Sequence, residues 1–112
     1  MVKQFDIITV DLNPTRGKEK NKYRPCVVVS NKLLNRGSAF SWVLPITHRP
    51  PRRPSDIPIR TRYGKVGGII DTVQIRALDL SARHAVVIDK LDQALQDVVL
   101  ETIQIHTEML EK

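Results

Sequence analysis

The chain has 112 residues, one cysteine and a formal net charge of +6 at pH 7. This length suits one domain with a proper core, and a hydrophobic fraction of 41% argues against a disordered chain. We therefore expect a single domain over residues 1–112. The lone cysteine excludes an internal disulfide and a cysteine-rich zinc cluster. The excess of Lys and Arg favours an anionic partner.

The N-terminal sequence, MVKQFDIITVDL, has no apolar run long enough for a signal peptide or a membrane span. We expect a cytoplasmic protein without a membrane partner, which suits an unpaired, buried Cys26. The sequence also contains no glycine-rich phosphate loop, no Cys/His cluster and no nucleophilic serine flanked by glycines. If the protein is an enzyme, we expect it to work without a metal ion or an organic cofactor.

The first two predicted strands are residues 5–12 and residues 26–29. The four consecutive apolar residues of the second indicate a strand that is buried on both faces. Pro25 suits the start of such a strand, and Arg24 directly before it should lie at the strand rim and point outward. An arginine on a rigid support can bind phosphate through two parallel hydrogen bonds. A surface arginine lying over the sheet edge is the alternative.

Positive charge is concentrated in two loops. Residues 15–24 carry five basic residues and one acid, Glu19. Glu19 could form a screened surface salt bridge worth ~0–1 kcal/mol, or it could take a proton from a substrate held by Arg24. Residues 48–65 carry six Lys or Arg residues, four prolines and one acid. Such a long basic loop, with a short edge strand at residues 56–60, suggests contact with a nucleic-acid backbone.

Between these loops, Ser30 or Asn31 can cap a short helix at residues 32–36. A third strand is predicted at residues 40–46, with Trp42 and Val43 reaching the core. Pro45 within it indicates an edge position or a bulge. The strand ends at Thr47 and His48, which could satisfy loop backbone groups or line a site.

The C-terminal half predicts strands at residues 69–75 and 83–89, and a helix at residues 93–110 capped by Asp92. Gln74 and Arg76 share a parity and should point to one face of their strand. Cross-strand hydrogen bonding is the alternative role for Gln74. One apolar stripe runs along the helix and consists of Leu95, Val98, Val99, Thr102, Ile103, His106 and Leu110.

The motifs VDLNPTRGKEK, RPCVVVSN, LPITH and TVQIRALDLSAR follow one another over nearly the whole chain. In combination they closely resemble the MazF/PemK toxins of toxin–antitoxin modules. The resemblance implies a mainly β fold with a C-terminal helix, namely a small SH3-like antiparallel barrel of the MazF/PemK/CcdB type. It also implies a homodimer that cleaves single-stranded RNA sequence-specifically, without metal or cofactor, and that a cognate MazE/PemI-like antitoxin neutralises.

The resemblance also implies roles for individual residues. Arg24 and Thr47 stand at the positions of the family's catalytic arginine and threonine, and Glu19 matches its acidic position before that arginine. Gln74 matches the glutamine of its Gln-hydrophobic-Arg strand. The expected RNA contacts are Lys18, Lys20, Asn31, Asn35, Arg36, His48, Arg49, Gln74 and Arg76, and no metal ligand is expected.

The sequence departs from the family pattern at four places. Val73 stands where an acid or amide is common, Lys20 replaces a glutamine, and Phe5 replaces a common glycine. Asp71 and Val73 occupy the places of the Arg-x-Asp pair of plasmid-type members. We therefore do not expect the Arg/Asp/His version of the mechanism.

The residues fit RNA cleavage chemically, because RNA carries its own nucleophile in the 2′-hydroxyl. Arg24 would stabilise charge on the phosphoryl oxygens, an effect worth ~3–4 kcal/mol per well-placed donor. Thr47 would orient a non-bridging oxygen and Glu19 would act as base, giving 2′,3′-cyclic phosphate and 5′-hydroxyl ends. The alternatives are a non-catalytic CcdB-like inhibitor of DNA gyrase and a basic RNA-binding module without activity.

Overall fold

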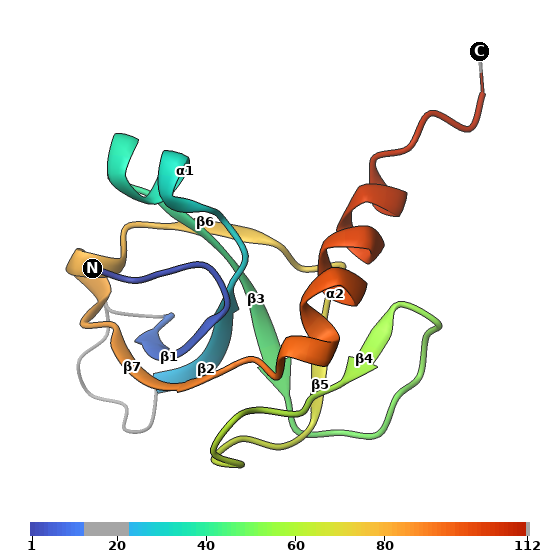
Figure 1. Cartoon of the computed structure of the whole chain (residues 1–112), viewed down its shortest axis with the longest axis horizontal. Helices are drawn as coiled ribbons and strands as arrows, with labels where there is room; N and C mark the ends of the chain where they lie inside the picture. The colour runs from blue at the N-terminus through green and yellow to red at the C-terminus, as the bar shows by residue number, and fades with distance from the viewer. Residues whose placement is uncertain (13–22, 112) are drawn as a thin grey trace.

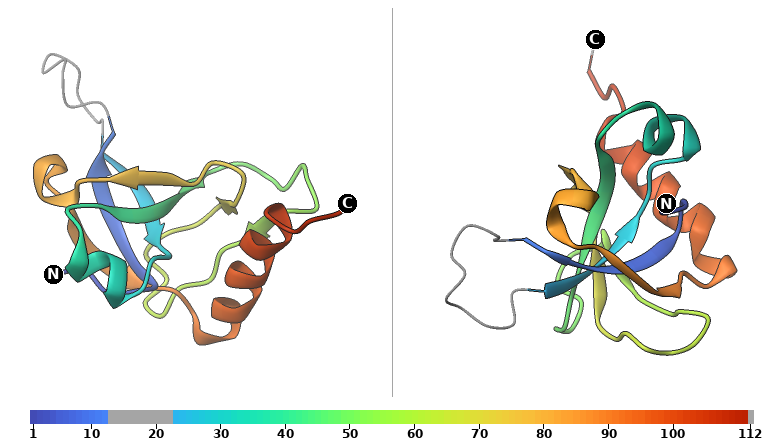
Figure 2. Two further views of the ribbon diagram at one scale, coloured as in Figure 1. Left: turned by 90° about the horizontal axis from the view of Figure 1, so that it is seen from above. Right: turned by 90° about the vertical axis from the view of Figure 1, so that its left-hand side faces the viewer.

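The computed structural model describes residues 1–12 and 23–111. Its elements are β1 (Asp6–Asp11), β2 (Tyr23–Val28), α1 (Lys32–Gly37), β3 (Ser41–Thr47), β4 (Asp56–Pro58), β5 (Ile69–Asp71), β6 (Arg76–Leu78), the 3-10 helix η1 (Leu80–Arg83), β7 (Val86–Lys90) and α2 (Gln93–His106). The seven strands form one antiparallel sheet in the order β4-β5-β3-β2-β1-β7, and β6 also pairs with β3. Figures 1 and 2 show α2 lying beside this curved sheet.

The predicted fold class is confirmed, and the sheet is barrel-like only in a loose sense. β4 and β7 stand at its two ends, so the ladder does not close. Within the described residues, an isolated antiparallel bridge between Thr61 and Leu91 brings the segment after β4 to the segment after β7. The sheet therefore curls toward a barrel and stays open.

The centre of the sheet is buried on both faces, as the apolar run 26–29 predicts. Val27 contributes to one core cluster, which includes Ile7, Leu44 and Val99 of α2. Cys26 and Val28 point the other way, into a second cluster with Ile8, Val10, Val43, Leu78 and Leu80. The period of two along each strand separates the two sets. Burial raises the pKa of the Cys26 thiol to about 12, against a smaller opposite effect of the Arg76 charge, so this thiol is an inert core group.

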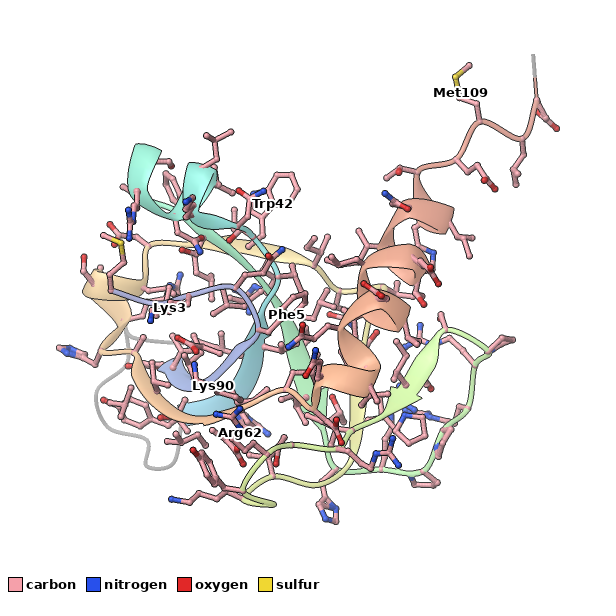
Figure 3. All side chains as sticks on the ribbon, in the orientation of Figure 1. Lys3, Phe5, Trp42, Arg62, Lys90 and Met109 are labelled. Carbon is pink, nitrogen blue, oxygen red and sulfur yellow. The ribbon has the colours of Figure 1, made fainter. Side chains whose placement is uncertain are left out.

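β3 is a central strand, which corrects the edge position expected from Pro45. One side of β3 pairs with β2, and the other pairs first with β6 and then with β5. Pro45 falls between the β6-paired and β5-paired stretches, so its missing N–H breaks no ladder there. Val43 is buried as expected, whereas Trp42 is 47% exposed. Alternation along the strand sends these two side chains to opposite faces, and no element of the described chain covers Trp42 fully (Figure 3).

The strand predicted at residues 69–75 is broken into β5 and β6 by a turn. Both strands pair with β3. Ile70 of β5 and Arg76 of β6 are six residues apart, whereas their partners on β3, Ile46 and Val43, are three apart, so the chain between β5 and β6 has three extra residues. The excess forms the turn after Asp71, whose carboxylate accepts a hydrogen bond from the Val73 N–H at 3.1 Å. The buried Thr72 follows Asp71, and its hydroxyl donates to the Ser55 carbonyl at 3.0 Å.

α2 begins at the predicted cap, since the Asp92 side chain accepts from the Ala94 N–H, but it ends at His106 rather than at residue 110. Val99 is buried and Leu95 and Ile103 pack on the core, as the predicted stripe requires, whereas Val98 of the same stripe is 42% exposed. Leu110 is 83% exposed, so the stripe loses its support beyond the sheet. The strand predicted at residues 83–89 is also shorter, because η1 occupies its start.

No helix in the described part of the chain is both long enough and apolar enough to cross a membrane.

Candidate active site

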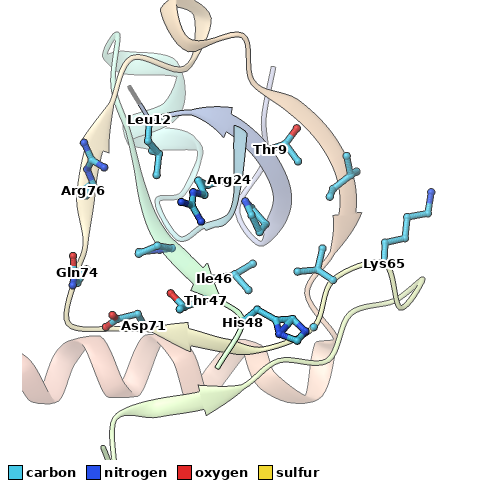
Figure 4. A pocket seen from close by; sticks show the side chains of 15 residues that line it. Thr9, Leu12, Arg24, Ile46, Thr47, His48, Lys65, Asp71, Gln74 and Arg76 are labelled. Carbon is cyan, nitrogen blue, oxygen red and sulfur yellow. The ribbon is translucent and has the colours of Figure 1, made fainter. Parts of the chain in front are cut away.

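An open pocket of about 580 Å³ lies where β2 and β3 meet the turn between β5 and β6 (Figure 4). Arg24 from β2 and Thr47 from the end of β3 both line it. Gln74, Arg76 and His48 line it as well. The structure thus brings together five of the residues that the sequence singles out.

The strand register explains why Arg24 and Thr47 line the same pocket. β2 and β3 pair antiparallel with Cys26 opposite Pro45, and extending this register by two residues places Arg24 opposite Thr47. Residues directly opposite on one face of an antiparallel pair are nearest neighbours across strands. Arg24 also belongs to the β1 ladder, opposite Val10, so its backbone is held on a paired strand while its side chain is exposed.

Gln74 and Arg76 reach the same pocket from the other side of β3. Arg76 opens β6 opposite Val43, and Gln74 precedes it in the turn that follows Asp71. The Gln74 N–H closes this turn onto the Asp71 carbonyl at 3.4 Å. Gln74 and Arg76 were expected on one face of a single strand. Both line the pocket, but Gln74 lies in the turn before β6 and not in a strand.

The pocket wall is electropositive. Arg24, Arg76 and Lys65 contribute cations, and Asp71 is its one carboxylate within the described residues. One oxygen of that carboxylate accepts from the Arg53 guanidinium at 3.2 Å. The pocket is therefore suited to an anionic ligand such as a phosphodiester.

A carboxylate–arginine cluster fixes the basic loop of residues 48–65. The buried Asp56 carboxylate accepts from the Arg49 guanidinium at 2.8 Å and from the backbone N–H groups of Arg52 and Arg53. The hydrogen bond from Arg49 is the main reason that the pKa of Asp56 lies well below its usual range, and the hydrogen bond from the Arg52 N–H adds to this effect. The same pairing raises the pKa of Arg49. This segment of the loop is consequently built around its own ion pairs.

The end of the same loop forms the wall beside β5. The Tyr63 and Lys65 N–H groups donate to the two oxygens of the buried Asp89 carboxylate at 2.9 and 3.0 Å. Burial alone would raise the pKa of Asp89, but the hydrogen bonds it accepts lower that pKa to about 2. Asp89 therefore stays ionised near neutral pH and holds the backbone that presents Lys65 to the pocket.

The other predicted site residues lie elsewhere. Asn31 and Arg36 line a separate cavity beside the N-terminus. Asn35 is buried and binds Ser30 through both side-chain polar atoms, which gives it a structural role in place of the expected RNA contact. Arg49 is likewise committed to Asp56. Glu19, Lys18 and Lys20 lie outside the described residues.

Three features of the site were not singled out from the sequence, namely Lys65, Asp71 and Gly68. Lys65 and Asp71 line the pocket, and Gly68 packs behind it. The two adjacent glycines at residues 67–68 were the available signal, because a close backbone approach often requires glycine. Across the described ranges, no three His, Cys, Asp or Glu side chains gather in a way that could hold a metal ion.

The chain has relatives among proteins of known activity. It is 32% identical over 115 residues to the endoribonuclease EndoA of Bacillus subtilis, covering 99% of this chain and 98% of that protein. It is 42% identical over 52 residues to the endoribonuclease MazF9 of Mycobacterium tuberculosis, a match that covers 42% of this chain and 44% of the relative.

Solved structures share the fold. A MazE–MazF crystal structure from Deinococcus radiodurans superposes with a TM-score of 0.80 at 18% identity, covering 96% of each chain. An endoribonuclease in complex with its cognate antitoxin, from a mycobacterial species, gives a TM-score of 0.76 at 14% identity and covers both chains completely.

The family model that matches residues 3–107 describes PemK-like, MazF-like toxins of type II toxin–antitoxin systems. Its match spans both walls of the pocket and nearly all of the described sheet. The chain belongs to this PemK/MazF toxin family.

Proposed function

We propose that this protein is an endoribonuclease toxin that cleaves single-stranded RNA in the pocket between β2, β3 and the β5–β6 turn, and that a MazE-like antitoxin neutralises it. The observation that carries the proposal is that Arg24 of β2 and Thr47 of β3 line one electropositive pocket. The family match and the named endoribonuclease relatives favour this function over gyrase inhibition and over a binding module without activity.

The chemistry follows from these positions. The 2′-hydroxyl of the bound nucleotide attacks the adjacent phosphorus, and negative charge grows on the non-bridging oxygens. Arg24 supplies a preorganised guanidinium to that charge, and the Thr47 hydroxyl donates to one oxygen. Arginine remains protonated at neutral pH and is a poor base, so Glu19 is our candidate for removing the 2′-hydroxyl proton.

Gln74, Arg76 and Lys65 hold the strand in this scheme. Gln74 can donate and accept hydrogen bonds toward a base edge, whereas Arg76 and Lys65 bind phosphates. The products carry 2′,3′-cyclic phosphate and 5′-hydroxyl ends. The proposed reaction needs no divalent ion, as the family resemblance implies.

The test is cleavage of a single-stranded RNA by the purified protein in the presence of EDTA, with mapping of the end groups. We expect Arg24→Ala to lower the single-turnover rate by at least ~10² without changing the fold, because it removes a preorganised charge. Arg62→Ala is the matched control, since Arg62 is exposed and lies outside the pocket. A 2′-deoxy nucleotide just upstream of the cut should block cleavage.

Cleavage at the wild-type rate by a folded Arg24→Ala protein would refute the assigned site. Loss of activity in EDTA, or normal cutting of the 2′-deoxy substrate, would refute the mechanism.

A further inference from the structure

His48 directly follows Thr47 on a tight turn at the end of β3. The Arg49 N–H donates to the Thr47 carbonyl at 3.0 Å, which closes a three-residue turn centred on His48. Along a continuing strand, Thr47 and His48 would point to opposite faces. The turn ends that alternation, and both side chains line the same pocket (Figure 4).

The turn is held from two sides. A Cβ atom on Gly68 would lie 2.3 Å from the Thr47 carbonyl oxygen and 3.0 Å from the His48 Cα, so the segment before β5 packs directly on this peptide. On the other side, the Arg49 guanidinium binds the buried Asp56 carboxylate at 2.8 Å. The exposed imidazole of His48 is therefore carried by a fixed backbone, as proton transfer to a defined atom requires.

RNA cleavage by the proposed route needs two proton transfers, one from the 2′-hydroxyl and one to the departing 5′-oxygen. The charged groups that face His48 across the pocket are Arg24 of β2, Lys65 of the basic loop, Asp71 of β5 and Arg76 of β6. Arginine and lysine side chains stay protonated near neutral pH. The two oxygens of Asp71 are engaged by the Val73 N–H and by Arg53. Among the described residues of the pocket, His48 offers the one side-chain type that readily exchanges a proton at neutral pH.

We propose that His48 is the general acid of this enzyme, an assignment that rests on the proposed function. In the step concerned, the bond from the 2′-oxygen to phosphorus forms and the bond from phosphorus to the 5′-oxygen breaks. The 2′-hydroxyl proton passes to the base, and a ring N–H of His48 gives its proton to the 5′-oxygen. No electron donor or acceptor is required.

Glu19 is the candidate base of the proposed function, so the proton transfer left for His48 is the one to the departing 5′-oxygen. Attacking and leaving oxygens lie roughly in line through phosphorus, so the acid and the base belong on opposite sides of the bound phosphate.

The test compares two RNA substrates of one sequence, a natural one and one with sulfur in place of the departing 5′-oxygen. A thiolate leaves readily without a proton, so the sulfur substrate does not need a general acid. We expect His48→Gln to cleave the natural RNA about 10²–10⁴ times more slowly than the wild type, and to cleave the sulfur substrate within about tenfold of the wild-type rate. The pH–rate profile of the variant should also lack one ionisation that the wild type shows.

His84→Asn is the matched control, because His84 is exposed, lies outside this pocket, and has a left-handed backbone that asparagine tolerates. It should cleave both substrates at wild-type rates. An unchanged rate for His48→Gln on natural RNA, or an equal loss on both substrates, would overturn the general-acid role; the second outcome would make His48 an RNA contact. A wild-type protein that cleaves no RNA would instead refute the proposed function itself.

Discussion

Gly68 shows how a residue without a side chain can define this site. Its φ of +111° lies in a region that other residues rarely adopt, and its Cα faces the Thr47–His48 peptide. The close approach keeps the end of β3 against the start of β5, where Thr47 pairs with Ile69. Any added atom at Gly68 must therefore displace the backbone that carries Thr47.

We expect Gly68→Ala to destabilise the fold by roughly 1–3 kcal/mol and also to lower the cleavage rate. The added methyl group would strain the backbone at Gly68 and displace the Thr47 carbonyl at the same time. Thermal unfolding and single-turnover kinetics measure the two effects. Gly37→Ala is the control, since nothing lies within 4 Å of a Cβ there. Wild-type stability and activity in Gly68→Ala would show that the backbone around this glycine yields easily.

The sequence pointed to Arg24 and Thr47, which both line the candidate pocket, because both stand at the ends of predicted strands. Arg24 stands before an apolar run and Thr47 ends one, so each is expected at the rim of a sheet, and the pairing of β2 with β3 brings the two rims together. Gly68 and Asp71 could not be found in this way, since their roles depend on contacts between segments far apart in sequence. Phe5 has a φ of +74°, which gives a physical reason for the glycine that is common at its position in the family.

At the scale of elements, some arginines of the basic loop of residues 48–65 form ion pairs within the fold, and others face the solvent. Arg49 and Arg53 bind the carboxylates of Asp56 and Asp71, whereas the Arg52 side chain is exposed. The sequence showed the charge of this loop but not its pairing, because the partners of its arginines are fixed only by the folded loop and by β5. The same limit applies to the break between β5 and β6, which comes from pairing with β3.

We expect Arg49→Ser to change the stability of the fold and Arg52→Ser to change RNA binding. Arg49→Ser should lower the melting temperature at neutral pH, because it removes the shorter guanidinium contact of the buried Asp56 carboxylate, at 2.8 Å, and leaves the longer contact of Arg53 at 3.6 Å. Since the pKa of Asp56 is depressed in the fold, its stabilising effect is present above about pH 4 and is lost as the pH falls. The acid limb of the stability profile should therefore be shallower in Arg49→Ser.

Arg52→Ser should keep the melting temperature and reduce the salt dependence of RNA binding, by about 0.7 in slope for each phosphate that the protein no longer neutralises. Binding is measured with an RNA that carries a 2′-deoxy nucleotide at the cut. An unchanged slope in Arg52→Ser would assign the loop to a partner other than RNA, and an unchanged melting temperature in Arg49→Ser would make the ion pair with Asp56 dispensable.

At the scale of the molecule, several large apolar side chains remain uncovered in the structure. Phe40 is 48% exposed, Trp42 47% and Ile75 40%, and Ile105 at the end of α2 is 61% exposed. The family resemblance implies a homodimer. On that ground we propose an isologous contact that buries Trp42 and extends the electropositive pocket.

Because Trp42 is the single tryptophan, its fluorescence reports directly on this proposal. We expect sedimentation of a dimer at micromolar protein, and a red shift of the Trp42 emission upon dilution as the indole becomes more exposed to water. A charge at Trp42 should oppose the contact, so Trp42→Lys should sediment as a monomer while keeping its fold. A dimeric Trp42→Lys protein would place the interface elsewhere.

The same geometry predicts that antitoxin and RNA exclude each other. The pocket is lined by Arg24, Lys65 and Arg76, so an acidic antitoxin segment and an RNA strand are attracted to the same cations. A peptide from the acidic C-terminal region of the cognate antitoxin should therefore displace a 2′-deoxy-blocked RNA from the wild-type protein. Its apparent affinity should fall as the RNA concentration rises, and both ligands should bind more weakly at high salt. Simultaneous binding of peptide and RNA in a stable ternary complex would show that the antitoxin acts from outside the pocket.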